Sequence, residues 1–253
     1  MPEPREHLQE PLLRRVAKAL LYPVRLVRWV IRGKKYNTQD GYREEKYWED
    51  RHKKFEGDFR AVASYSEEEQ LRYPQQKEQL LHILSEHDIS IAGRNVVEFG
   101  CGNGFWGGVM LEAGAESYTG IDISQTAVDF CKKQFSQGQF IRHHLGDSSV
   151  QLERQYNLVC SIDVTQHVVE RAKLMQFLGD MQHCAESDSL IFCTSYLTDN
   201  EEEAGVRKKS LNVNFVVPWS VKSISEGFSN CELVRVHEFW DKSLLVFRKR
   251  REQ

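Results

Sequence analysis

The sequence of 253 residues lacks several features that would place it in other protein classes. No uncharged run approaches the ~20 residues that a membrane-spanning helix requires, because arginine and lysine interrupt the apolar stretch at 11–35 and leave at most six uncharged residues in a row. No two of the six cysteines form a Cys-x-x-Cys pair, which disfavours a disulfide framework or a zinc site. We therefore expect reduced, buried thiols in a cytoplasmic protein without a signal peptide.

The sequence also lacks the charge patterns that are typical of metal sites or of proteins that bind nucleic acid by their overall positive charge. The net charge is −3, which argues against a protein that coats nucleic acid by bulk charge. No set of His, Asp and Glu has the spacing of metal ligands, so no metal is expected. Internal repeats and low-complexity segments are absent from the sequence as well.

The charge that is present is unevenly divided. Residues 1–35 carry nine basic and three acidic side chains, whereas the remainder carries 25 basic and 34 acidic ones. Residues 11–35 have apolar positions at roughly helical spacing, eight basic residues and no acidic one, with Pro23 as a kink. This composition is typical of an interfacial membrane helix. A helix that docks on its own protein or on a second subunit, and a mobile tail, remain alternatives.

Short apolar segments alternate with segments of helical periodicity from residue 94 onward. The predicted strands are 95–99, 117–121, 139–143, 156–162 and 189–194, and the predicted helices are 105–113, 124–137, 170–184 and 219–227. Two closing segments, 232–239 and 243–248, predict an antiparallel hairpin. This order predicts an α/β fold with a mostly parallel sheet. We expect a basic helical arm at 1–35, a helical cap at 36–90 and the main domain at 91–253, with cap helices at 44–55 and 75–88.

The strongest local signal is the segment Val96-Val97-Glu98-Phe99-Gly100-Cys101-Gly102-Asn103-Gly104. It is a strand that runs into a glycine-rich turn, and glycine allows a tight turn and a close approach to a ligand. Phe105 stands where a dinucleotide GxGxxG motif needs its third glycine, and no Gly-Lys-Ser/Thr ending follows. A loop that cradles a pyrophosphate is therefore disfavoured.

Acidic residues follow the next two predicted strands. Asp122 lies 18 residues after Gly104, and a carboxylate at that strand end can accept hydrogen bonds from both ribose hydroxyls. Asp147 lies in a Gly-Asp-Ser turn after the third strand. Such a turn is unremarkable alone, but its position favours binding of an exocyclic adenine amine. We therefore expect a nucleoside site at this sheet edge.

In this order the motifs resemble those of the class I S-adenosylmethionine-dependent methyltransferases, over about residues 75–248. VVEFGCGNG resembles the family's first motif, with Glu98 as its acidic strand residue, and YTGIDIS resembles the second, with Asp122 as the ribose ligand. GDS at 146–148 resembles the adenine motif, and YNLVCSIDVTQHV at 156–168 resembles the fourth-strand motif. YWEDRH at 47–52 and DVTQHV are similar to a bacterial branch that acts on small molecules.

This resemblance implies a Rossmann-like methyltransferase sheet and S-adenosyl-L-methionine as the cofactor. The expected cofactor-binding residues are Glu98, Gly100, Cys101, Gly102, Asn103, Gly104, Trp106, Asp122, Ile123, Asp147, Ser148, Ser161, Tyr47, Trp48 and Arg51. Of these, Tyr47, Trp48 and Arg51 could form a lid, with the arginine paired to the methionyl carboxylate, or belong to an ordinary packing helix. Trp106 could equally be buried under the sheet.

A hydroxyl acceptor would need a base to remove its proton. Asp163 and His167 lie just beyond the fourth strand, and the unperturbed pKa of histidine suits this work near neutrality. His167 could instead cap a helix or pack beneath the cofactor.

The resemblance leads us to expect transfer of a methyl group to an oxygen of a small-molecule, saccharide or lipid-linked acceptor. If residues 11–35 bind an anionic membrane surface, we expect this reaction to take place beside that surface. A protein or peptide methyltransferase and a non-catalytic S-adenosylmethionine-binding partner protein are the alternatives. Nucleic acid is disfavoured as the acceptor, because the fourth strand ends in Ser161-Ile162-Asp163-Val164 and not in Asn/Asp-Pro-Pro-aromatic. The sequence does not predict an oligomeric state.

Overall fold

The computed structural model describes residues 35–38, 41–62, 67–206 and 216–251, which fall in two compact units. The smaller unit contains the described residues up to Arg43, where β1 (Asn37–Thr38) and β2 (Gly41–Tyr42) pair antiparallel. The larger unit begins at Glu44 and contains everything discussed below. The predicted basic arm lies outside the described residues except for Lys35, as do residues 207–209.

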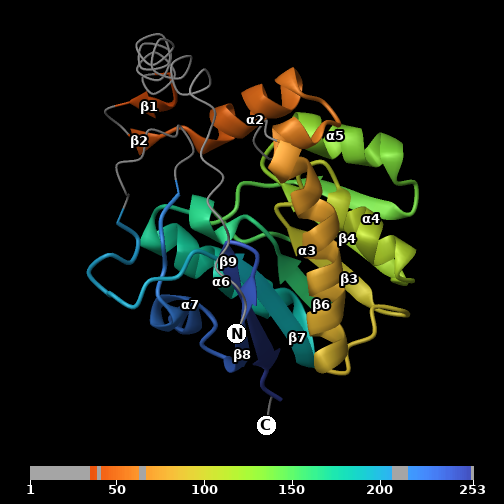
Figure 1. Ribbon diagram of the computed structural model, residues 1–253, viewed down its shortest axis with the longest axis vertical. Coiled ribbons are helices and arrows are strands. Elements are labelled where there is room, and N and C mark those ends of the chain that lie inside the picture. The colour runs from red at the N-terminus through yellow and green to blue at the C-terminus, as the bar shows by residue number, and fades with distance from the viewer. Residues whose placement is uncertain (1–34, 39–40, 63–66, 207–215, 252–253) are drawn as a thin grey trace, which may run out of the picture. The chain divides into compact units, whose positions relative to one another are not determined.

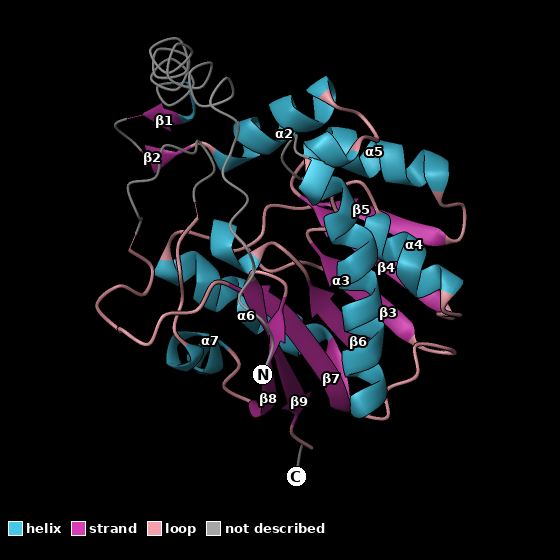
Figure 2. Ribbon diagram, viewed as in Figure 1, coloured by secondary structure: helices cyan, strands magenta, loops and turns pink. Residues whose placement is uncertain are grey.

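A seven-stranded sheet forms the centre of the larger unit (Figures 1 and 2). Its strands are β3 (Asn95–Phe99), β4 (Ser117–Asp122), β5 (Gly138–Arg142), β6 (Tyr156–Ser161), β7 (Ala185–Ser195), β8 (Cys231–Phe239) and β9 (Lys242–Lys249). They lie in the order β5-β4-β3-β6-β7-β9-β8. The first five are parallel, and β9 runs antiparallel to both β7 and β8. The predicted fold class, a mostly parallel Rossmann-like sheet with an antiparallel C-terminal hairpin, is confirmed.

Helices cover both faces of this sheet. They are α2 (Glu44–Lys54), α3 (Glu67–Glu86), α4 (Phe105–Glu112), α5 (Gln125–Gln134), α6 (Arg171–Cys184) and α7 (Val221–Gly227), with short 3-10 turns at Phe59–Ala61 and Thr165–His167. One apolar layer joins α3, α4 and α5 to the sheet, and a second joins α6 and α7 to its other face. Successive strand residues alternate between the layers, Val96 in the first and Val97 in the second. All six cysteines are buried free thiols.

Helix α3 begins earlier than the sequence predicted. The amphipathic pattern predicted a helix over residues 75–88. The structure carries the helix through Pro74 from Glu67. Tyr73 and Leu80, on either side of the proline, pack into the same apolar layer, and this packing compensates for the backbone hydrogen bond that proline cannot donate.

The connections between strands fix where a ligand can bind. From β3 the chain continues to β4 and β5 on one side, and then returns to place β6 on the other side of β3. Such a reversal leaves a crevice at the carboxyl ends of the strands. The glycine-rich turn follows β3 directly, so it lies at this crevice. Within the described residues, no helix combines the length and the apolar character needed to cross a membrane.

Gly100 provides a test of how tightly this turn is packed. Its φ is +86°, and a Cβ placed there would lie 2.2 Å from Cγ2 of Val164. Gly93 is a matched control, since its φ is +73° but nothing lies within 4 Å of an added Cβ. We expect Gly93→Ala to lower the free energy of unfolding by ~1–2 kcal/mol, the cost of the left-handed conformation. Gly100→Ala should lower it by a further ~1–3 kcal/mol through overpacking. Urea denaturation measures both, and equal losses would contradict the steric argument.

Candidate active site

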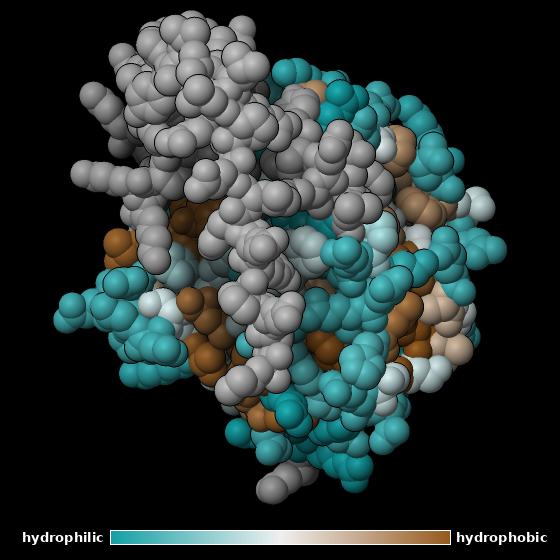
Figure 3. Space-filling model, viewed as in Figure 1, coloured by the Kyte–Doolittle hydropathy of each residue, from teal (hydrophilic) through white to brown (hydrophobic). Residues whose placement is uncertain are grey.

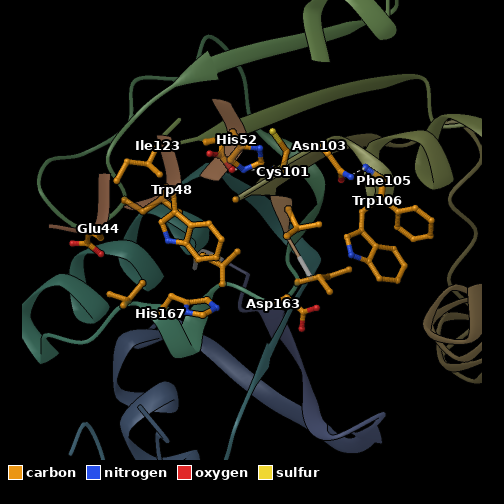
Figure 4. A pocket seen from close by; sticks show the side chains of 18 of the residues that line it. Glu44, Trp48, His52, Cys101, Asn103, Phe105, Trp106, Ile123, Asp163 and His167 are labelled. Atoms are coloured by element: carbon orange, nitrogen blue, oxygen red, sulfur yellow. Dashed lines mark hydrogen bonds between the residues drawn. The ribbon is translucent and has the colours of Figure 1, made fainter. Parts of the chain in front are cut away.

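A cavity lies at the carboxyl ends of β3, β4 and β6 (Figure 4). The strand ends contribute the glycine turn at 100–103, Asp122 and Ile123 after β4, His144 and Leu145 after β5, and residues 162–164, 167 and 168 after β6. Helix α2 and the aromatic residues Tyr73, Phe105 and Trp106 provide the remaining walls together with Val62. The cavity is thus bounded by the strand ends that the sequence predicted to carry a nucleoside.

The glycine turn is held against β4 by backbone hydrogen bonds. The N–H groups of Gly100 and Cys101 both donate to the carbonyl oxygen of Ile121, at 2.7 and 2.9 Å. Gly100, Gly102 and Gly104 all have positive φ. A Cβ on Gly102 would come within 2.9 Å of Val62, which lines the cavity. Absence of side chains therefore leaves room for a ligand to approach the backbone of the turn.

Asp122 connects the turn to the next helix. Its Oδ2 accepts from the N–H of Gly102 at 2.8 Å, and its Oδ1 accepts from the N–H of Ser124 at 2.9 Å. The side chain is 7% exposed and lines the cavity. Each carboxylate oxygen can accept more than one hydrogen bond, so Asp122 can also accept from ribose hydroxyls.

Glu98 and Ser161 support the site from outside the cavity. Burial raises the pKa of Glu98 to about 8, with a smaller contribution from the negative charge of Asp122, and the hydrogen bond from the Tyr118 hydroxyl only partly opposes this. Glu98 therefore carries a proton at neutral pH. The hydroxyl of Ser161 donates to the carbonyl oxygen of Phe99 at 2.9 Å. Neither side chain lines the cavity.

Helix α2 faces the cavity with residues four positions apart. Glu44, Trp48 and His52 line the cavity, because this spacing places them on one side of a helix. Of the lid residues that the sequence suggested, only Trp48 lines it. Arg51 instead donates to the Tyr47 hydroxyl at 2.8 Å and to the carbonyl oxygen of Arg60 at 3.2 Å.

Neither Glu44 nor His52 was among the predicted site residues, although both line the cavity. The signal that could have found both is the spacing of four on either side of Trp48. His52 is buried, and its pKa is lowered by burial even though the nearby charge of Asp122 opposes this. It therefore presents a neutral imidazole to the cavity.

Glu49 fastens α2 to the start of α5. Its Oε2 accepts from the Ser124 hydroxyl at 2.7 Å and from the Thr126 N–H at 3.2 Å, and its Oε1 accepts from the Thr126 hydroxyl at 2.8 Å. Burial opposes ionisation of Glu49, but these hydrogen bonds together lower its pKa to about 2. A carboxylate at a helix N-terminus is also favoured by the helix dipole. Glu49 therefore stays ionised, and its contacts between α2 and α5 stay in place, until the pH falls toward about 2.

The predicted adenine motif lies differently from the other motifs. Asp147 does not line the cavity, and its Oδ1 and Oδ2 lie 2.9 Å from Nζ of Lys173 and 2.8 Å from Nδ1 of His144. Ser148 is exposed, and its carbonyl oxygen accepts from the imidazole of His143 at 2.9 Å. The turn brings His144 and Leu145 to the cavity instead.

The two candidate bases both line the cavity but in different surroundings. Asp163 has a φ of +64°, and its carboxylate lies 2.8 Å from both the Arg72 guanidinium and Nζ of Lys242. His167 packs edge-on against Trp48, with ring centroids 5.1 Å apart. Figure 4 shows Trp48 and His167 on one side of Asp163 and Trp106 on the other. Asn103, Cys101 and Ile123 line the cavity as well.

Comparisons with known proteins agree with this geometry. A family model described as a methyltransferase domain matches residues 96–188. Magnesium protoporphyrin IX methyltransferase (ChlM) from Synechocystis PCC 6803, solved with bound SAH, has a TM-score of 0.59 at 16% identity, over 81% of this chain and 97% of that one. The N-methyltransferase NodS from Bradyrhizobium japonicum WM9 has a TM-score of 0.52 at 16% identity, over 70% and 96%. No curated protein matches the sequence.

The matched domain and the cavity together define an S-adenosylmethionine-dependent methyltransferase. The matched segment contains the glycine turn, Asp122, the turn after β5 and the β6 end, which are the strand ends that bound the cavity. The residues present fit the cofactor, because the turn offers backbone without side chains and Asp122 offers acceptors for a ribose. Branches of this class differ in the acceptor that they methylate, and the acceptor is considered under the proposed function below.

Asp122→Ala tests the ribose contact. The variant loses acceptors for two backbone N–H groups and for the ribose, so affinity for S-adenosylhomocysteine should fall by ~1.5–3 kcal/mol, or roughly 10- to 150-fold. Calorimetry measures the affinity. Asp129→Ala, which removes an exposed carboxylate of α5 that only Gln125 contacts among the hydrogen bonds described, should bind as the parent does. Unchanged affinity in Asp122→Ala would remove this residue from the site.

Proposed function

We propose that this enzyme methylates an oxygen of a small-molecule, saccharide or lipid-linked acceptor, with His167 as the general base. The observation that carries the proposal is the position of His167, which lines the cavity beside the β6 end and against Trp48. The sulfonium of the cofactor supplies an activated methyl group. The protein's own tasks are then to align the acceptor oxygen and to accept its proton.

Asp163 is less suited to proton removal than His167. Its carboxylate already lies within 2.8 Å of two cations, Arg72 and Lys242, and the side chain of Lys242 is only 2% exposed. Each of its two oxygens therefore already has a cationic partner, which leaves less room for an acceptor hydroxyl at this carboxylate. We assign to Asp163 the role of holding the β6 end in its left-handed conformation, where its N–H donates to the Thr194 hydroxyl at 2.7 Å.

Aromatic walls support an acceptor with an apolar part. Tyr73, Phe105 and Trp106 meet at one end of the cavity, with the ring centroids of Tyr73 and Phe105 4.9 Å apart. Flat aromatic faces contact apolar rings or chains over a large area. ChlM, by its name, methylates a magnesium porphyrin, which is an acceptor of this general kind; for the present enzyme we extend the class to saccharides and lipid-linked acceptors.

His167→Ala tests the base. An acceptor is first identified by transfer of a labelled methyl group to saccharides, lipid-linked saccharides and hydroxylated ring compounds. With that acceptor, kcat of the His167→Ala variant should be lower than that of the parent enzyme by ~10²–10⁴-fold. Affinity for S-adenosylhomocysteine should change by no more than a few-fold. His183→Ala, an exposed residue of α6 outside the cavity, is the control. A loss of kcat below a few-fold would return His167 to a packing role, and transfer only to peptides would refute the acceptor class.

Residues 11–35 are proposed to bring the enzyme to an anionic membrane surface. Their eight cations and interleaved apolar side chains carry this proposal, since each Lys or Arg near such a surface contributes about 1 kcal/mol before screening. The described surface offers no comparable feature. Its exposed large hydrophobic residues are Val206, Val234, Val236 and Trp240, and Figure 3 shows a mainly hydrophilic described surface with separate hydrophobic areas.

Liposome co-sedimentation tests the membrane role. The full chain should pellet with vesicles containing anionic lipid at low salt and be released at high salt, because screening shortens the range of the attraction. A chain that begins at Tyr36 should stay in the supernatant under both conditions. If the full chain also stays in the supernatant at low salt, residues 11–35 are a packing element and the membrane role is wrong.

A further inference from the structure

The cavity has two ends that differ in chemistry. Figure 4 shows Phe105 and Trp106 at one end, and Glu44 and Ile123 at the other. His144, whose Nε2 lies 3.7 Å from Oε1 of Glu44, and Leu145 also line the cavity. If the ribose hydroxyls bind Asp122, the base would lie beside Ile123, the next residue in the chain, which lines the cavity with Leu145. Their apolar side chains suit the faces of a purine ring. The polar groups at this end then decide which purine binds.

Asp147, the expected partner of the adenine amine, is turned away from this end. Its side chain is 47% exposed, and Lys173 and His144 occupy its two oxygens. Because Asp147 does not line the cavity, its carboxylate has to move before it can meet a base bound there. The structure therefore leaves the amine without the acceptor that the sequence motif implied.

Glu44 has the position that Asp147 lacks. Its side chain is 14% exposed and lines the cavity. Oε1 accepts from Nζ of Lys173 at 3.0 Å and lies 3.7 Å from Nε2 of His144. Within the described part of the chain, no hydrogen bond is found to Oε2. One oxygen is thus held by a partly buried ion pair, while the other can accept a hydrogen bond from a ligand.

We infer that Glu44 accepts the hydrogen bond from the exocyclic amine of the cofactor's adenine and so selects adenine over purines that carry a carbonyl there. Lys173 joins Glu44 and Asp147, so Asp147 acts as a positioning residue through Lys173. The inference concerns only the methyl donor and does not depend on the acceptor or on His167.

Calorimetry with two ligands tests this selection. S-adenosylhomocysteine has the amine, and S-inosylhomocysteine has a carbonyl oxygen in its place. The parent enzyme should prefer the adenosyl ligand by about fivefold or more, since the carbonyl places an acceptor oxygen opposite the carboxylate where the amine would donate. In Glu44→Gln, the side-chain amide can donate to the carbonyl, so the preference should fall to near one or invert.

Two variants serve as matched controls. Glu45→Gln changes the adjacent residue in the same turn of α2, whose 52% exposed side chain pairs with Arg142, and should keep the parent preference. Asp147→Asn should also keep the preference, although both affinities can fall together. If Asp147→Asn abolishes the preference and Glu44→Gln does not, or if the parent binds both ligands equally, the inference is overturned.

A variant that retains the negative charge tests the inference even if Glu44→Gln fails to fold. Glu44→Asp keeps a carboxylate for Lys173 but withdraws it by one methylene, so the preference should fall by at least half. Full parent preference in Glu44→Asp would overturn the inference. Thermal denaturation establishes that each variant is folded before its affinities are compared. Because the readout is binding, failure of the proposed acceptor chemistry leaves this result intact.

Discussion

The contacts of the Asp122 carboxylate with two backbone N–H groups hold the site together. One oxygen fixes Gly102 in the turn after β3, and the other fixes Ser124 at the start of α5. The hydroxyl of Ser124 then accepts from Ala127 N–H and donates to Glu49. A single charged group thus links the glycine turn, α5 and α2, and charge-assisted hydrogen bonds of this kind are stronger than neutral ones.

Residues that line the cavity are also held by ion pairs. Lys173 joins Glu44 of α2 to Asp147, which follows β5, and Asp163, which follows β6, joins Arg72 of α3 to Lys242 of β9. The helices that precede the sheet in sequence therefore contribute walls through polar contacts, in addition to the apolar layer under α3. Because such pairs need several partners at fixed distances, the walls form only after the sheet has positioned the strand ends.

Local sequence was sufficient for features that a single segment determines. The glycine turn, the strand before it and the alternation of strands and helices follow from residue types at short spacing, such as Gly100 to Gly104. The start of α3 did not follow, because the predicted helix began only after Pro74, whereas Tyr73 before it packs into the same apolar layer as Leu80. The sequence also did not predict which side of α2 faces the cavity. Tyr47 and Trp48 are both aromatic, and only the packing of α2 in the folded protein decides that Trp48 lines the cavity and Tyr47 does not.

The sequence by itself determined the fold class, the cofactor and the carboxylate at Asp122, because each depends on motifs whose residues stay adjacent after folding. Only the tertiary structure decided that Glu44 and His52 line the cavity while Asp147 and Arg51 do not. Each of these side chains has competing partners far along the chain, such as Lys173 for Asp147. Which partner prevails depends on distances and burial that exist only once the helices have packed on the sheet.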